Sequence, residues 1–435
     1  MRKLNQKIAK IGIISFVICL SVFYSCEKTD YNTERNTVQY NSELRKISLS
    51  KGDGLVSESV ALDIATKFNP LIFFKQDNPT NYSKKISKLN GNNKIKDKTV
   101  IKDSHNIPAF YIFNYENNQG FIFVSADYKM QPILAFFESG EFKKDIVPSG
   151  LLQWVDKTME NIEILRKGGY DNSNDANYAW DNYYNHNSNK TAPPPTNPCD
   201  EPDTSYTVGP LLSVTWGQGY SYNELCPNLS CTNGNSYAYT GCVATAATQV
   251  VKYWHPTNQY NYNYTSMPTN QGNSEVRRLM RDMGNNVGMN YGCSGSSANG
   301  SNVAPVLKAN FGFSSANNAN YDYQRVKNNI NAQQPVLLKG CRTSTGNWFI
   351  INWGNSYSDC HQWVCDGSNT YNYTNCENGQ WQSGGSYLFF HMNWGWHEVG
   401  IYNDYSGWFL FNNWNINSLN QNYQYCNELT SEIHP

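Results

Sequence analysis

The sequence predicts an α+β protein in which a small N-terminal domain precedes a larger, loop-rich domain. Residues 109–137 contain three short apolar runs separated by turn residues, which is typical of neighbouring antiparallel strands. Residues 242–254 carry apolar side chains at helical spacing. After residue 200, Asn, Tyr, Gly and Trp are abundant and Lys is scarce, which favours a domain that is loop-rich and partly β.

The length of the chain limits the number of domains, and its net charge limits the classes of partner. The 435 residues are enough for two or three domains with ample material for a core. The formal net charge at pH 7 is −1, so the composition does not indicate a nucleic-acid partner.

The N-terminus has the pattern of an export signal over residues 1–26. Basic residues precede an apolar run at 11–23, and this run is too short for a stable membrane span. Cys26 stands where a bacterial lipoprotein is cut and acylated, although Phe23 occupies a position where Leu is usual. We therefore expect an exported protein, attached to the outer membrane or cell surface through a lipidated Cys26 or, as the alternative, secreted. The polar residues 27–50 then form a tether.

Residues 51–167 form the predicted small domain. Apolar residues recur at helical spacing over 55–68, and a second amphipathic helix contains residues 151–162. Residues 75–105 are rich in Lys and Asn and are expected to form a loop. Between this loop and the second helix lie the three predicted strands, 109–115, 120–125 and 132–137.

Residues 168–204 are predicted to be an exposed linker. They are rich in Asn, Asp, Tyr and Pro and show no periodic pattern. Proteases cut exposed linkers preferentially, so we expect activation cleavage in this segment.

Cys242 opens the helix predicted over 242–254. Gly241 permits a tight entry into the helix, and His255-Pro256 ends it. The first turn of a helix has unpaired N–H groups and a positive dipole end, and a cysteine beside them ionises more readily. The alternative is a small buried thiol that happens to begin a core helix.

A nucleophilic cysteine also needs a base, and the candidate lies far downstream. The stretch 359–367 contains His361, and Asn393 follows in the stretch 391–396. Cys, His and Asn in this order form a papain-like arrangement. The whole set resembles the streptopain family of secreted bacterial cysteine peptidases. The matching segments are residues 216–218, residues 240–246, His361 followed by residues 363–367, and residues 393–396.

This resemblance implies a papain-like, two-lobed catalytic domain over residues 205–435. A central helix would carry Cys242, and an antiparallel sheet would carry His361 and Asn393. The small domain resembles the family's prodomain, above all at 120–127 and 132–134. In the family this domain folds against the catalytic cleft and keeps the zymogen silent, so the chain's own prodomain is an expected intramolecular partner.

The resemblance also implies a role for each site residue. Cys242 would attack the peptide carbonyl as a thiolate, and His361 would hold the ion pair and then protonate the leaving amine. Asn393 would orient the imidazole, and Trp394 would cover the Asn393–His361 bond from water. Gln218 would donate to the oxyanion together with the backbone N–H of Cys242. The substrates would be proteins or peptides with a hydrophobic side chain one residue before the cleaved position.

The chain departs from the family pattern at two places beside the site. Cys360 replaces the glycine that usually precedes the catalytic histidine, and its side chain either crowds the cleft or is held in a disulfide. His397-Glu398 follow Trp396 where the family commonly continues with glycines. We therefore expect Cys360 and Trp396 to contact substrate and these changes to affect specificity more than mechanism. His255, His391 and His397 are interpreted as structural or surface residues.

The twelve cysteines leave room for disulfides and for a rival interpretation. Apart from Cys19, Cys26 and Cys242, nine cysteines remain, so at least one is unpaired within the monomer. In an exported chain most of them should form disulfides, and Cys226 with Cys231 is the easiest local pair. The rival interpretation is a metal site, which we disfavour because the spacing matches no standard zinc motif; its ligands would be Cys360, His361, Cys365 and Cys376. We expect no metal and no cofactor.

The sequence thus predicts a zymogen of a secreted or surface-anchored bacterial cysteine endopeptidase. Two alternatives from other classes remain open. One is a catalytically silent binding or inhibitor protein that keeps the papain fold. The other is a papain-like acyltransferase or amidase that uses the same three residues.

Overall fold

The computed structural model describes most of the small domain and most of the larger one. The elements that position the site lie in one compact unit, Ile47–Ile416 with Asn422–Pro435. The export signal, the tether and most of the predicted linker lie outside the described residues. Among the residues described, no helix is both long and apolar enough to cross a membrane. The described residues are 54–70, 89, 91–144, 147, 149–168, 176, 179–180, 204–232, 235–341, 360–377, 380–397, 405–411, 415–416, 421–422 and 428–435.

In the described part of the small domain, a four-stranded meander has one α-helix before it and one after it. Helix α2 (Glu58–Lys67) begins after Ser57, whose side chain accepts a hydrogen bond from the backbone of Val60. Helix α3 (Ser149–Lys167) closes the domain. The strands are β1 (Ile95–Lys102), β2 (Pro108–Tyr115), β3 (Phe121–Ser125) and β4 (Ile133–Phe137), with the short helix η3 (Glu116–Asn118) between β2 and β3.

The core of the small domain is aromatic. The rings of Phe121 and Phe137 stack 3.8 Å apart, and Phe123 meets Trp154 of α3 edge to face at 5.6 Å. Arg166, near the end of α3, makes ion pairs of 2.7 Å with Asp103 and 2.8 Å with Asp127. These contacts attach α3 to one face of the meander along its whole length.

The larger domain has a helical part with its own apolar core. Buried residues of α5, α6 and α7 form this core together with Val214, Trp216 and Leu337. The helices are α5 (Cys242–Trp254), α6 (Ser274–Val287), α7 (Val303–Asn310) and α8 (Tyr323–Asn331), with the short turns η5 (Tyr264–Ser266) and η6 (Gly300–Asn302).

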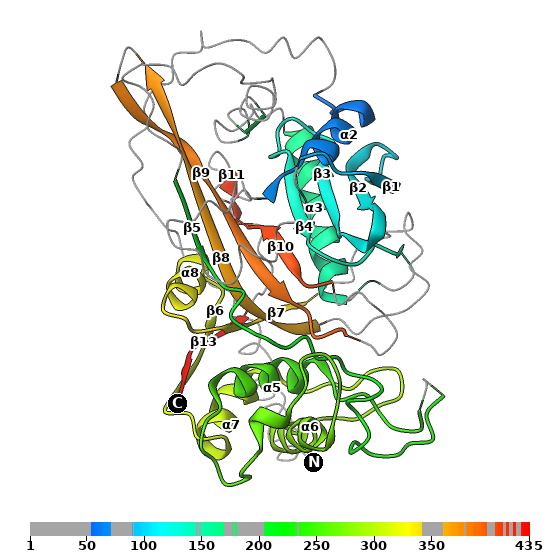
Figure 1. The fold of residues 1–435 in the computed structure, drawn as a ribbon, viewed down its shortest axis with the longest axis vertical. Coiled ribbons are helices and arrows are strands. Elements are labelled where there is room, and N and C mark those ends of the chain that lie inside the picture. Colours follow the sequence, from blue (N-terminus) through cyan, green and yellow to red (C-terminus); the bar gives the residue numbers. More distant parts are fainter. Residues whose placement is uncertain are drawn as a thin grey trace, which may run out of the picture. The chain divides into compact units, whose positions relative to one another are not determined.

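The strands of the larger domain continue the sheet of the small one. Along the sheet the order is β1-β2-β3-β4-β10-β9-β8-β7-β13-β6, and β5 pairs with β8. Figure 1 shows β8 and β9 as long antiparallel strands side by side, with β5 along β8. The bounds are β5 (Thr204–Val208), β6 (Ser315–Asn320), β7 (Val336–Cys341), β8 (Cys360–Glu377), β9 (Gln380–Asn393), β10 (Gly407–Leu410), β11 (Asn415–Ile416), β12 (Gln421–Asn422) and β13 (Glu428–His434).

The predicted α+β class is confirmed, with the cysteine on a helix and the histidine and asparagine on antiparallel strands. One local prediction is wrong: the expected loop over 75–105 contains strand β1. This strand lies at the edge of the sheet and, except for Ile101, its side chains are exposed or half-buried, so its sequence lacks the apolar alternation of a covered strand. Strand β5 begins at Thr204, the last residue of the predicted linker.

Candidate active site

Cys242 is the first residue of α5, and the backbone before it is held in a conformation that favours glycine. Gly241 has φ 86°, and a Cβ atom there would lie 2.7 Å from the sulfur of Met289. Both the backbone angle and the close contact therefore exclude a larger residue. This fixes the entry into the helix and the position of the thiol.

The surroundings of Cys242 favour its thiolate. Burial by itself raises the pKa of the thiol, but the positive charge of His361 and hydrogen bonds from His361 and from the backbone of Gln362 and Val243 lower the pKa below its ordinary value. The pKa values of the other free cysteines among the described residues shift in the opposite direction. Burial raises the pKa of Cys226 to about 12 and that of Cys365 well above its ordinary value. Only Cys242 among these three has the electrostatic environment of a nucleophile.

His361 is the second residue of β8 and is 2% exposed. Its Nε2 lies 3.0 Å from the backbone oxygen of Trp394. A carbonyl oxygen can only accept, so Nε2 carries the proton of this bond and Nδ1 is left to exchange a proton with the thiol. The structure therefore brings the predicted nucleophile and base together and fixes the imidazole by a backbone acceptor.

Asn393 ends β9 and is buried, and the hydrogen bonds of its side chain go to groups other than the imidazole. Its Nδ2 donates to the oxygen of Val214 at 2.8 Å and to Oε1 of Gln249 at 3.1 Å, and its Oδ1 accepts from the backbone of Gly395 at 3.2 Å. In this structure the Trp394 carbonyl makes the orienting bond that we expected from Asn393. The catalytic role of Asn393 stays a prediction.

Gln218 is half-buried, and its backbone is attached to the start of α5. Its carbonyl oxygen accepts from the backbone of Thr240 at 3.0 Å. The preceding Gly217 lies so close to the carbonyl of His397 that a Cβ atom would be 1.6 Å from that oxygen. The segment that carries Gln218 is thus held between the nucleophile helix and the loop after β9.

Tryptophan rings surround the histidine. The ring of Trp363 lies parallel to that of His361 at 6.1 Å, and the ring of Trp396 meets it edge to face at 6.4 Å. Trp394 packs 4.9 Å from Trp363 and 5.3 Å from Phe409 of β10. These rings exclude water from the imidazole and strengthen its electrostatic interactions.

The small domain contacts His361 directly. Gly150, in the first turn of α3, is buried, and a Cβ atom there would lie 2.5 Å from the Trp394 ring and 2.7 Å from Cδ2 of His361. Strand β4 also pairs with β10, where Phe136 lies opposite Trp408. The start of α3 therefore covers the imidazole in this form of the chain.

The cysteine pairing differs from the local prediction. Cys231 forms a disulfide with Cys293, and Cys226 is free and buried, so the predicted Cys226–Cys231 pair is wrong. Cys360 is exposed and disulfide-bonded, which resolves the alternatives for its side chain. A disulfide sulfur is not a thiolate, so the rival metal interpretation loses Cys360 as a ligand. The side chain of Cys376 lies outside the described residues.

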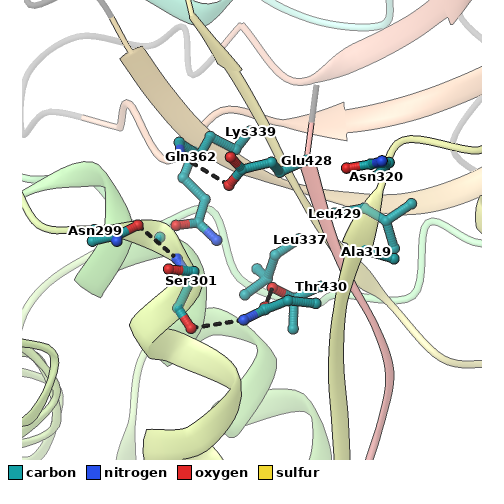
Figure 2. A pocket seen from close by; sticks show the side chains of 12 residues that line it. Asn299, Ser301, Ala319, Asn320, Leu337, Lys339, Gln362, Glu428, Leu429 and Thr430 are labelled. Carbon is teal, nitrogen blue, oxygen red and sulfur yellow. Dashed lines mark hydrogen bonds and ion pairs between the residues drawn. The ribbon is translucent and has the colours of Figure 1, made fainter. Parts of the chain in front are cut away.

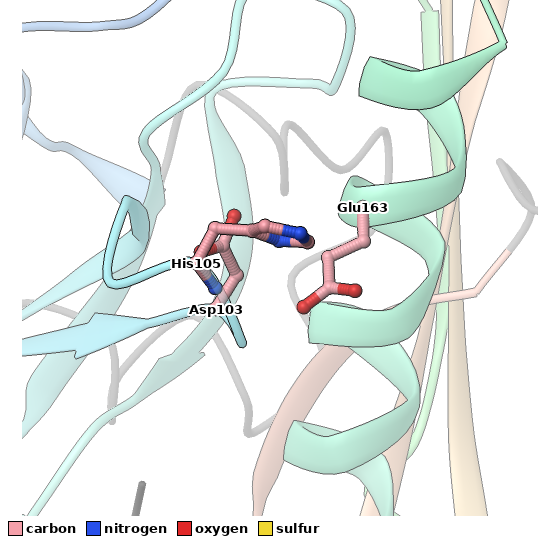
Figure 3. A group of neighbouring side chains, drawn as sticks. All are labelled: Asp103, His105 and Glu163. Carbon is pink, nitrogen blue, oxygen red and sulfur yellow. Dashed lines mark hydrogen bonds between the residues drawn. The ribbon is translucent and has the colours of Figure 1, made fainter.

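Another cluster of metal-ligating side chains lies in the small domain and is formed by Asp103, His105 and Glu163 (Figure 3). The Asp103 carboxylate accepts from the backbone of His105 and from Arg166, and Glu163 accepts from the backbone of Ser104 at 2.7 Å. Both carboxylates are thus engaged in attaching the turn after β1 to α3. The cluster has a structural explanation without a metal.

The remaining histidines have local roles. His255 is exposed and forms the left-handed C-cap of α5. Nδ1 of His391 lies 2.6 Å from Asp366, and this carboxylate also accepts from the backbone of Leu212. The backbone of His397 packs on Gly217.

Three residues near the site were missed by the sequence analysis. Gln249 is buried on the apolar face of α5, and a polar residue on such a face is a signal that could have been noticed. Gln362 donates its backbone N–H to Cys242, and Gly150 packs on His361. Neither of these two has a sequence signal, because both contacts depend on how distant segments fold together.

Comparison with known proteins agrees with this arrangement. Residues 54–162 match the Spi protease inhibitor family, and residues 216–266 and 255–406 match the Peptidase C10 family. Streptopain from Streptococcus pyogenes is 26% identical over 344 residues, which cover 66% of this chain and 71% of streptopain. The thiol protease/hemagglutinin PrtT of Porphyromonas gingivalis is 23% identical over 339 residues, covering 66% of this chain but 32% of PrtT.

Solved structures of a Prevotella intermedia peptidase are also similar. A prointerpain A fragment has a TM-score of 0.49 and 21% identity, and covers 78% of this chain and 99% of the fragment. Active interpain A has a TM-score of 0.38 and 22% identity, and covers 53% of this chain and 96% of that structure. From the sequence matches we conclude that residues 216–406 form a cysteine peptidase domain similar to the Peptidase C10 family, with a domain similar to the Spi protease inhibitor family ahead of it at residues 54–162.

Proposed function

We propose that the chain is the exported zymogen of a cysteine endopeptidase that hydrolyses peptide bonds through Cys242, His361 and Asn393. The observation that carries this proposal is the pairing of Cys242 with His361 at the start of α5, together with the lowered pKa of the thiol. A thiolate beside an imidazolium is the resting state from which such a peptidase attacks.

In the proposed mechanism, the Cys242 sulfur attacks the peptide carbonyl and forms a tetrahedral intermediate. The imidazolium of His361 gives its proton to the leaving amine, which departs and leaves an acyl-enzyme thioester. Neutral His361 then takes a proton from water, the water oxygen attacks the thioester, and the thiolate returns with release of the acid. The carbonyl of Trp394 supports this cycle because it holds the imidazole through Nε2.

Gln218 and the backbone N–H of Cys242 are the proposed donors to the oxyanion. The hydrogen bond between Gln218 and Thr240 supports this role because it holds the Gln218 backbone next to the helix start. Loss of one such donor typically costs about a hundredfold to a thousandfold in rate. Asn393 is proposed to orient His361 in the active enzyme, with Trp394 shielding the pair, and Trp396 and Cys360 are proposed to border the bound substrate.

Residues 51–167 are the proposed intramolecular inhibitor of the peptidase domain, 205–435. The contact of Gly150 with His361 supports this, because a peptide cannot occupy space that α3 fills. We place the activating cleavage in the linker 168–204, after which the inhibitor domain can leave the site.

Export is proposed from the signal at 1–26, with lipid attachment at Cys26. The apolar run and the position of the cysteine in the sequence support it. Fractionation of cells that express the full chain tests the attachment. Wild-type protein should be recovered with membranes and Cys26→Ser should not, and equal membrane recovery of both would refute lipidation at Cys26.

The test of the catalytic proposal is peptide hydrolysis by the full chain and by Cys242→Ala. We expect the variant to lose at least about a thousandfold in kcat/KM, because it removes the attacking sulfur and little volume. Cys226→Ala is the matched control, since it removes another free cysteine whose pKa is raised rather than lowered. Substantial hydrolysis by Cys242→Ala, or an equal loss in Cys226→Ala, would contradict the assignment.

A further inference from the structure

Asp366 is the extra residue of a β-bulge between β8 and β9. Cys365 pairs with Met392 and Gly367 pairs with His391, so Asp366 is an additional residue on β8. A bulge re-aims a side chain and is common next to active sites. Here it carries a carboxylate that is 1% exposed, and no step of the proposed mechanism uses this group.

The Asp366 carboxylate binds donors from two separate segments. Its Oδ1 lies 2.6 Å from Nδ1 of His391 on β9, and its Oδ2 accepts from the backbone N–H of Leu212 at 3.0 Å. The backbone oxygen of Asp366 also accepts from Leu211 at 2.8 Å. Leu211 and Leu212 belong to no helix or strand, so these bonds fix where their segment lies.

Both segments lead to Asn393 within two residues. On β9, His391 is two residues before Asn393. In the other segment, Leu212 is two residues before Val214, and the Val214 carbonyl accepts from Nδ2 of Asn393 at 2.8 Å. The hydrogen bonds and the chain together close a ring, which runs through Asp366, His391, Asn393, Val214 and Leu212.

Asn393 in turn fixes the backbone acceptor of the imidazole. Strand β9 ends at Asn393, so no strand pairing holds the carbonyl of Trp394 in place. Oδ1 of Asn393 accepts from the backbone N–H of Gly395 at 3.2 Å, which closes the turn around Trp394. The carbonyl in this turn is the group that lies 3.0 Å from Nε2 of His361. The orientation of the imidazole therefore depends on the ring that Asp366 closes.

The packing around the pair of Asp366 and His391 keeps the two side chains together. The His391 ring meets the buried ring of Trp408 edge to face at 5.2 Å. A Cβ atom at Gly367 would lie 2.8 Å from Cβ of His391, so the glycine permits this close packing. The side chains of His391 and Asp366 are 12% and 1% exposed, and a hydrogen bond that is shielded from water is electrostatically stronger.

We propose that Asp366 and His391 are positioning residues that hold the Trp394 carbonyl against His361 and so keep the imidazolium next to Cys242. Both act through Asn393 rather than by contact with the reacting atoms. The proposal rests on the proposed function, because it takes His361 as the base.

Alkylation of Cys242 by iodoacetamide as a function of pH, measured on the full chain, tests the proposal without any need for peptide hydrolysis. Asp366→Ala and His391→Leu each open the ring. An imidazolium that is less well held stabilises the thiolate less, so the alkylation profile of Cys242 should move to higher pH. We expect a shift of about half a unit to one unit, which lowers the rate at about pH 6 by about threefold to tenfold. An unchanged profile in either folded variant would overturn the proposal.

A conservative variant separates positioning from the loss of a ring. In His391→Asn the side-chain amide offers an N–H donor near the position of the histidine Nδ1, so the bond to Asp366 can re-form. This variant should keep the wild-type profile of Cys242, whereas His391→Leu should not. Melting temperatures show which variants are folded, and equal shifts in folded His391→Asn and His391→Leu would contradict the proposal.

A double-mutant cycle tests whether Asp366 acts through Asn393. Asp366→Ala and Asn393→Ala should each lower kcat/KM for a peptide substrate by about tenfold. Because Asn393→Ala already opens the ring, adding Asp366→Ala to it should lower kcat/KM little further. Losses that multiply in the double variant would refute this route.

Two variants elsewhere in the peptidase domain are controls. Asp282→Ala removes another buried carboxylate, which accepts from the Tyr262 hydroxyl at 2.8 Å. Thr430→Val removes a buried hydroxyl that donates to Asn318 at 2.8 Å. Thr430 lines a cavity of about 450 Å³ between η6 and strands β6, β7, β8 and β13 (Figure 2). Both variants should lower the melting temperature and leave the Cys242 profile unchanged. A shift in either control as large as that of Asp366→Ala would show that the profile follows stability alone, and would overturn the proposal.

Failure of the proposed function appears in a different measurement. It would be an absence of peptide hydrolysis by the wild-type chain, and the alkylation profiles do not depend on that result.

Discussion

A single buried oxygen, Oε1 of Gln249, connects three segments that carry predicted catalytic residues. It accepts from the backbone of Trp216 at 3.0 Å and from Nδ2 of Asn393 at 3.1 Å. Trp216 leads to Gln218, Asn393 precedes the Trp394 carbonyl, and Gln249 itself lies on the helix of Cys242. The relative positions of the proposed nucleophile, base and oxyanion donor therefore depend on this amide.

We predict that Gln249→Leu lowers kcat about tenfold or more while KM changes little. The change removes the acceptor of the Trp216 backbone N–H and one of the two acceptors of Asn393 Nδ2, and lets the three segments shift, but it touches no part of the proposed substrate site. Gln249→Glu retains an acceptor and should recover part of the loss. Steady-state kinetics on a peptide substrate and the melting temperature of each variant provide the measurement.

The matched control for Gln249 is its neighbour Thr248, which is equally buried on α5. Its hydroxyl oxygen lies 2.9 Å from the carbonyl oxygen of Thr245, to which it donates, and 3.2 Å from the sulfur of Met280. Thr248→Val should therefore affect melting temperature more than kcat. Similar kcat values for Thr248→Val and Gln249→Leu would show that Gln249 acts on stability alone.

At the scale of elements, the N-terminus of α3 is the part of the Spi-type domain that contacts His361, the proposed base. Trp154 of the same helix packs 5.1 Å from Phe409 of β10, and Phe409 in turn packs on Trp394. A continuous row of aromatic rings thus joins the inhibitor domain to the catalytic strand. Gly150 permits the closest approach because it has no side chain.

We predict that Gly150→Leu weakens inhibition, so that the uncleaved chain is several-fold more active than wild type. A side chain there overlaps the Trp394 and His361 rings, and α3 must move away from the site. Initial rates on a small peptide substrate, measured before processing begins, test this. Unchanged or lower activity of the uncleaved variant would contradict it.

Two comparisons isolate the effect of Gly150. After the inhibitor domain has been cleaved off, the variant and the wild type should have equal activity, because residue 150 is then absent from the enzyme. Leu62→Ala changes an exposed residue of α2 and should leave the uncleaved chain as silent as wild type.

Elements with strong periodicity could be predicted from the sequence, and elements without it could not. In helices α2, α3 and α5 and strands β2 to β4, the apolar residues recur at the spacing of the buried face of each element. Strand β1 is a mostly uncovered edge, so its Lys-rich sequence resembles a loop. At the site, residue types predicted that Cys242 and His361 would lie together, as they do in the structure, whereas the backbone acceptor at Trp394 has no side-chain signature.

At the scale of the whole molecule, a disulfide restrains two loops of the peptidase domain. The Cys231–Cys293 disulfide closes a sequence separation of 62 residues between the loop before α5 and the loop after α6. The sequence could predict that disulfides form but not this pairing, because Cys226 is nearer along the chain and only the fold brings Cys293 close. Both loops border the start of the nucleophile helix.

We predict that replacing Cys231 and Cys293 together by Ala lowers the free energy of unfolding by about 4 kcal/mol. The reason is the larger conformational entropy of the unfolded chain once a loop of this length is open. Chemical denaturation of wild type and the double variant measures the difference. Cys226→Ala, which breaks no disulfide, is the control, and a loss no larger than that of the control would contradict the prediction.

The central claim is that Cys242 and His361 form an activated thiolate pair, and the rate of Cys242 alkylation as a function of pH tests it most directly. Iodoacetamide reacts with thiolates, and mass spectrometry of peptides identifies which cysteine has reacted. Because the pKa of Cys242 is lowered, its thiolate should persist as pH falls below the range where an ordinary thiol protonates.

The account predicts that at about pH 6 Cys242 is alkylated much faster than Cys226, and that His361→Ala moves the pH profile of Cys242 up toward that of an ordinary thiol. The shift in His361→Ala follows from the loss of the positive charge and the hydrogen bond that lower the pKa. A Cys242 profile that rises only near the pH of an ordinary thiol, and that His361→Ala leaves unchanged, would contradict the account.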